Sequence, residues 1–76
     1  MQTLNEIRKG KKAIVTKING EGALKRRIMD MGITNGVQIK VLKFAPLGDP
    51  MEILLRGYLL TLRKADAALV EVEEVR

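Results

Sequence analysis

The sequence contains no histidine and no cysteine, and its only aromatic residues are Phe44 and Tyr58. Without histidine, the chain lacks the side chain that most often transfers protons near neutral pH. Without cysteine, it can form neither a disulfide framework nor a thiolate zinc site. Two aromatic rings also leave few faces on which nucleic-acid bases could stack. These absences argue against most catalytic and metal-binding functions.

Serine is absent as well, and the threonines have no histidine to activate them as nucleophiles. The carboxylates with catalytic potential, Asp30 and Asp49, have simpler structural interpretations. Asp30 is spaced to pair with Arg26 on a helix, and Asp49 lies in a turn. We therefore predict a protein that is not an enzyme, with no catalytic residue, no cofactor and no metal site. If a metal did bind, the first candidate ligands would be Glu71, Glu73 and Glu74.

No apolar run approaches the roughly 20 residues that cross a bilayer, so we predict no direct membrane insertion. The absence of cysteine agrees with a cytoplasmic location, which we also predict. Fourteen Lys and Arg residues against nine Asp and Glu give a net charge of +5. A positive excess favours anionic partners, which include nucleic acids and acidic proteins. Two classes of binding function therefore remain open.

The apolar periodicity predicts short strands and one helix. Leu24, Ile28 and Met31 lie on one stripe of a helix expected over residues 22–31, which ends before Gly32. Alternating or β-branched patterns predict strands near residues 12–18, 37–42, 51–56, 58–63 and 69–75, with a helical turn near 64–68. In a chain of 76 residues, this pattern predicts one all-β domain over residues 1–76, a small, strongly bent antiparallel barrel with one inserted short helix.

Three leucines do not follow the alternation of their strands. Leu42, Leu54 and Leu59 occupy the phase that carries charged residues elsewhere in the same strands. If that phase faces solvent, the leucines form an exposed apolar patch of the kind that binds proteins. Alternatively, the inserted helix or the N-terminal segment covers them. The sequence leaves both interpretations open.

Longer motifs resemble a known family. The segments RRIMDMGI (residues 26–33), GVQIKV (36–41) and PLGDPMEILLRGYLLTLRKADA (46–67) are similar to the FeoA family of small accessory proteins in bacterial ferrous iron transport. The resemblance runs nearly end to end, with Asn35 in place of a usual proline. It implies an SH3-like barrel, a cytoplasmic accessory role, and a partner, the cytoplasmic GTP-binding region of the membrane permease FeoB.

A protein interface needs a few apolar anchors with charges at its rim. Leu54 and Leu59 flank the predicted turn of Arg56, Gly57 and Tyr58, and we predict that this hairpin contacts the partner. Two basic helix residues, Arg26 and Arg27, would attract an acidic partner. The alternative function is a small basic nucleic-acid-binding barrel, although we expect no specific nucleic-acid recognition. Weak self-association of the chain also remains open.

Overall fold

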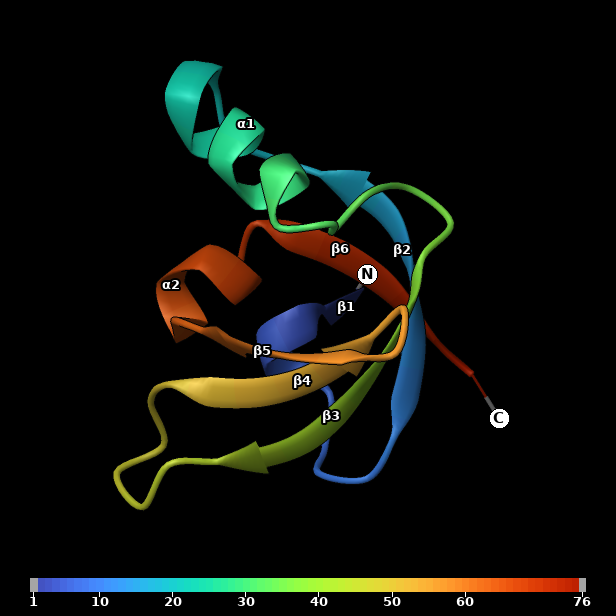
Figure 1. Cartoon of the computed structure of the whole chain (residues 1–76), viewed down its shortest axis with the longest axis vertical. Helices are drawn as coiled ribbons and strands as arrows, with labels where there is room; N and C mark the ends of the chain where they lie inside the picture. The colour runs from blue at the N-terminus through green and yellow to red at the C-terminus, as the bar shows by residue number, and fades with distance from the viewer. Residues whose placement is uncertain (1, 76) are drawn as a thin grey trace.

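The computed structural model describes residues 2–75, and six strands within this range form one curved antiparallel sheet (Figure 1). A 3-10 turn, η1, and two helices connect the strands. Along the chain the elements are β1 (Gln2–Thr3), η1 (Leu4–Glu6), β2 (Lys12–Ile18), α1 (Gly22–Asp30), β3 (Gln38–Phe44), β4 (Met51–Leu55), β5 (Tyr58–Leu62), α2 (Lys64–Ala67) and β6 (Val70–Val75). Neither helix of this range has the length and apolar character needed to span a membrane.

The strand order across the sheet is β1-β6-β2-β3-β4-β5. The first and last strands are therefore neighbours, with Gln2 opposite Val72. Strands β2 to β5 follow one another through the connections that carry α1 and the two hairpin turns. This arrangement leaves β1 and β5 as the two edges of the sheet.

Two irregularities in strand pairing bend the sheet. The register between β2 and β6 shifts between Val15 and Lys17, and the register between β3 and β4 shifts between Val41 and Lys43. An extra residue in one strand of a pair bends that strand and increases its twist. The sheet therefore curls around its own inner face, as the predicted strongly bent barrel requires (Figure 1).

The inner face of the curled sheet holds the hydrophobic core. Each long strand alternates buried and accessible residues, as period-two patterns predict. The helical elements add one fully buried side chain each, Leu4 from η1, Ile28 from α1 and Ala67 from α2. The side chains with the least exposure are Leu4, Ile7, Ile28, Ile33, Ile39, Met51, Ile53, Leu55, Leu62, Val15, Val41 and Val70.

Most predicted elements are confirmed to within two residues, but the helix packs less deeply than its stripe suggested. Ile28 is buried, whereas Leu24 is 38% exposed and Met31 is only partly buried. The helix α1 lies at one end of the sheet rather than across its inner face (Figure 1), so less of its apolar stripe is buried. The strand β1 was not predicted at all.

Candidate partner-binding surface

The β4–β5 hairpin turns through Arg56 and Gly57, both of which have positive φ angles of 49° and 82°. Two central residues of this kind define the turn type that matches the twist of a tight hairpin. The tip is attached to the segment that follows α1. The Tyr58 hydroxyl donates a hydrogen bond to the Met31 carbonyl, and Arg56 Nη2 donates one to Thr34 Oγ1 at 3.2 Å. The structure thus joins the predicted hairpin to the end of the predicted helix.

Gly32 makes this attachment possible. Its φ of +96° is in the region that favours glycine. A Cβ atom at this position would also overlap the Tyr58 hydroxyl oxygen. Two independent constraints therefore favour glycine at position 32, the positive φ angle of its backbone and the lack of space for a Cβ beside Tyr58.

Leu54 and Leu59 lie directly opposite each other on β4 and β5. The neighbours of Leu54, Ile53 and Leu55, are buried, so Leu54 points to the outer face of the sheet. Leu59 is directly opposite Leu54 and therefore points to the same face. Leu59 is 61% exposed, and Leu54 is half-buried. The helix therefore does not cover Leu59. Leu42, at the irregularity in β3, is half-buried as well.

On the outer face of the sheet, two lysines lie beside the pair of Leu54 and Leu59. Lys40 is opposite Leu54 on one side and opposite Lys12 on the other. Like charges placed directly opposite each other destabilise a sheet. Within residues 2–75, neither lysine takes part in an ion pair. Both lysines line a shallow hollow of about 300 Å³. Its lining residues are Lys12, Gln38, Lys40, Leu54, Leu55, Arg56 and Gly57.

The two predicted basic residues of α1, Arg26 and Arg27, differ in whether they form an ion pair. Arg27 Nη2 lies 2.9 Å from Asp66 Oδ1, which attaches α1 to α2. Arg26 is exposed, and the predicted ion pair between Arg26 and Asp30 is wrong, because the described residues form only the Arg27–Asp66 pair. The helical spacing of Arg26 and Asp30 was right, but such exposed pairs contribute little stability. Arg27 is therefore already engaged within the chain, whereas Arg26 is available.

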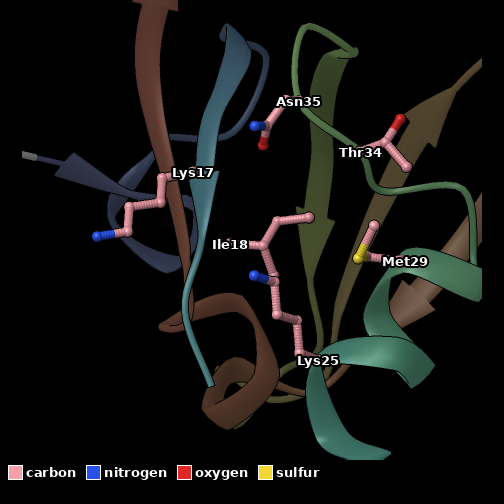
Figure 2. A pocket seen from close by; sticks show the side chains of 6 residues that line it. All are labelled: Lys17, Ile18, Lys25, Met29, Thr34 and Asn35. Atoms are coloured by element: carbon pink, nitrogen blue, oxygen red, sulfur yellow. The ribbon is translucent and has the colours of Figure 1, made fainter. Parts of the chain in front are cut away.

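A second hollow, of about 400 Å³, lies between α1, the end of β2 and the loop before β3 (Figure 2). Lys25 and Met29 reach it from α1, and the Lys17 ammonium group points away from it. The lining residues are Lys17, Ile18, Lys25, Met29, Thr34 and Asn35. None of these is a carboxylate, histidine or cysteine, so this hollow offers contacts rather than acid–base or metal chemistry.

Metal ligands do not gather anywhere in residues 2–75, where no three His, Cys, Asp or Glu side chains come together as a metal site requires. Some of the acidic residues make structural contacts. Glu71 Oε2 accepts a hydrogen bond from Asn19 Nδ2 at 2.6 Å, and Glu6 Oε1 accepts one from the Thr3 backbone N–H at 2.8 Å. The backbone bond from Thr3, followed by a bond from its hydroxyl, lowers the pKa of Glu6 below its ordinary value.

The family model of the FeoA domain matches residues 2–74. The chain belongs to the FeoA family. The solution structure of FeoA from Chlorobium tepidum is 43% identical with a TM-score of 0.90, and the match covers 99% of this chain and 71% of that one. FeoA from Stenotrophomonas maltophilia, an SH3 domain protein solved with zinc, is 23% identical with a TM-score of 0.82, over 96% of this chain and 91% of that one. The predicted SH3-like fold is confirmed.

A FeoA/FeoB fusion protein of Porphyromonas gingivalis is 39% identical over 70 residues. The match covers 92% of this chain, but the chain spans only 8% of the length of that relative. The FeoA family is associated with ferrous iron transport. In that relative, a segment similar to this chain and the transporter are parts of one polypeptide.

Sequence reasoning identified the hairpin but missed what surrounds it. The hydrogen bonds from Tyr58 and Arg56 end on Met31 and Thr34, which carry no local signal of this role. The pairing of Lys12 with Lys40 depends on the sheet register. The excess of basic residues was the only signal in the sequence that indicated such a concentration of positive charge.

Proposed function

We propose that this chain is a cytoplasmic accessory protein of ferrous iron uptake that binds the GTP-binding region of FeoB and performs no catalysis itself. The observation that carries the proposal is the fusion of a similar segment with FeoB in P. gingivalis. Domains that act together gain from being linked, because the link raises their effective concentration. The resemblance of the sequence to accessory proteins supports the same conclusion.

The outer face of the β4–β5 hairpin is the docking surface in this proposal. Leu59 supplies an exposed apolar anchor, and Leu54 extends it. Three cations, Lys12, Lys40 and Arg56, line the adjoining hollow. Apolar anchors beside charges of one sign favour a partner with complementary acidic groups. The exposed Arg26 on α1 adds to the same attraction.

The test uses full-length FeoB in nanodiscs and the variants Leu59→Glu and Leu54→Glu. Leu47→Glu is the matched control, because Leu47 is 97% exposed in the β3–β4 turn. We expect Leu59→Glu to weaken binding about tenfold or more while its melting temperature stays unchanged. The control should bind like the parent chain. A folded Leu59→Glu variant that binds normally would remove the hairpin from the interface, and a collapsed melting temperature would assign the leucine to the core.

The absence of cysteine provides a way to locate the contact. A photocrosslinker attached to Leu59→Cys would be the single thiol adduct of the chain. Its cross-links should fall in the GTP-binding region of FeoB, whereas the same group on Leu47→Cys should give few. Cross-links to the membrane-spanning part of FeoB would contradict the proposed region.

The second candidate function is nucleic-acid binding, which the opposing Lys12 and Lys40 favour. The chain has two aromatic residues, and Tyr58 is attached to Met31. We therefore expect phosphate contacts that weaken steeply as salt rises, without base selectivity. Fluorescence anisotropy with short single strands at low and physiological salt tests this. Sequence-selective binding that persists at the higher salt would favour the nucleic-acid function.

A further inference from the structure

The strand β5 presents an open edge. It is the last strand of the sheet order, and within residues 2–75 only β4 pairs with it. The two-residue turn makes Leu55 and Tyr58 the first hydrogen-bonded pair of the hairpin. Bonded and non-bonded pairs then alternate along the strands. The backbone N–H and C=O groups of Leu59 and Thr61 therefore point away from β4, and no backbone hydrogen bond among the described residues reaches them.

This edge lacks the usual protection against pairing. Edge strands are commonly blocked by charges, proline or bulges. The sequence of β5, YLLTL, contains neither charge nor proline, and its register with β4 is unbroken from Tyr58 to Leu62. Its outer side chains, Leu59 and Thr61, are both exposed. The opposite edge, β1, has only two residues. Extended chains can therefore add to β5 far more readily than to β1.

The charges around β5 decide what can pair with it. Arg56 precedes the strand, and Arg63 and Lys64 follow it directly. Two acids lie nearby. Glu52 has Lys43 as its cross-strand neighbour on one side and Thr61 on the other, and Asp49 accepts a hydrogen bond from the Lys64 backbone N–H at 3.0 Å. Because Lys64 already contacts Asp49 and Phe44, the edge is an uncharged, mostly apolar stretch with Arg56 at one end and Arg63 at the other.

A second copy of the chain is a poor occupant of this edge. Antiparallel pairing of β5 with itself about Leu60 would join the free groups of Leu59 in one copy to those of Thr61 in the other. The same register would bring Arg56 of each copy beside Arg63 and Lys64 of the other. Like charges facing each other destabilise paired strands, and each copy carries a net charge of +5.

We propose that β5 is extended by a seventh strand, a segment of the protein partner that is apolar at its centre and acidic at its ends. Main-chain hydrogen bonds to Leu59 and Thr61 hold the segment, and Leu59 contacts one of its apolar side chains. Acidic residues at its ends pair with Arg56 at one end and with Arg63 at the other. This inference rests on the proposed function, because it specifies how the chain binds FeoB.

The variant Thr61→Pro tests the inference directly. It removes an N–H group that the fold does not use, and proline is tolerated on an edge strand whose N–H faces solvent. The matched control Thr61→Val keeps the N–H and the branched shape. With full-length FeoB in nanodiscs, we expect Thr61→Pro to weaken binding about tenfold or more, and Thr61→Val to stay within about twofold of the parent. Melting temperatures of both variants monitor the fold.

Hydrogen–deuterium exchange of the unaltered chain gives an independent readout. The amides of Leu59 and Thr61 should exchange rapidly in the free chain and slow about tenfold or more in the complex, while Leu60, already bonded to β4, changes less. Binding of FeoB without slowing at Leu59 and Thr61, or a folded Thr61→Pro variant that binds normally, would overturn strand addition and leave the proposed function intact. Absence of any binding by the unaltered chain would overturn both. If Thr61→Pro fails to fold, the exchange result alone decides.

Discussion

Replacing Gly32 by alanine should destabilise the chain through two separable effects. The backbone at Gly32 has a φ of +96°, and a non-glycine residue in the left-handed region costs about 1–2 kcal/mol. The added Cβ would also displace the Tyr58 hydroxyl from the Met31 carbonyl, and losing that hydrogen bond costs about 1 kcal/mol. The expected total is about 2–3 kcal/mol, which corresponds to a fall of roughly 10–20 °C in melting temperature for a domain of this size.

Gly36 provides the matched control for the backbone term. Its φ is +87°, yet a Cβ at Gly36 would meet no atom within 4 Å. Gly36→Ala should therefore cost only the backbone strain, about 1–2 kcal/mol. The difference between the two variants measures the displacement of Tyr58. Urea unfolding followed by circular dichroism gives both free energies of unfolding.

A double-mutant cycle with Tyr58→Phe isolates the contact. Removing the hydroxyl removes the atom that the new Cβ would overlap, so Gly32→Ala should be less harmful in the Tyr58→Phe background, by about 1 kcal/mol. Equal costs in both backgrounds would refute the reasoning. So would a Gly32→Ala variant no less stable than Gly36→Ala.

Two further predictions concern carboxylates. The lowered pKa of Glu6 means that its carboxylate stabilises the folded chain above its ordinary pKa of 4.5, and that this stability is lost as pH falls through the lower folded value. Glu6→Gln should therefore melt below the parent chain at pH 7, with a gap that narrows in acid; a gap independent of pH would contradict the assignment. Anaerobic calorimetry with Fe(II) should show no stoichiometric high-affinity heat. If such heat is found, Glu71, Glu73 and Glu74 are the first positions to replace.

The elements set by local pattern could be predicted from the sequence. The β-branched run of β2 was predicted with its observed bounds, and the alternation in β4 and β5 gave the hairpin. The two residues of β1 are too few to show a period, and they form a strand only because β6 lies beside them. The bends near Val15 and Val41 reflect strand pairing, which depends on distant residues.

The candidate surface was predicted less completely, for a related reason. The alternation of its strand placed Leu59 in the phase that carries charged residues, but it left open whether this phase was exposed or covered. It could not show that Arg27 pairs with Asp66, which is 39 positions away, or that Tyr58 reaches Met31. Such contacts depend on how the helices and the hairpin meet in space. The docking role of Leu54, Arg56, Gly57, Tyr58, Leu59, Arg26 and Arg27 stays a prediction.

The pairing of β1 with β6 places Gln2 opposite Val72, at the far end of the strand order from β5. A polypeptide joined at either end of this fold would thus be attached to one of two neighbouring strands, and neither of these is β5. A tether of suitable length holds two partners at an effective concentration in the millimolar range. Under that condition, a surface with weak intrinsic affinity is occupied most of the time. The same surface on a free chain exchanges rapidly, so covalent linkage would turn an intermittent contact into a nearly permanent one.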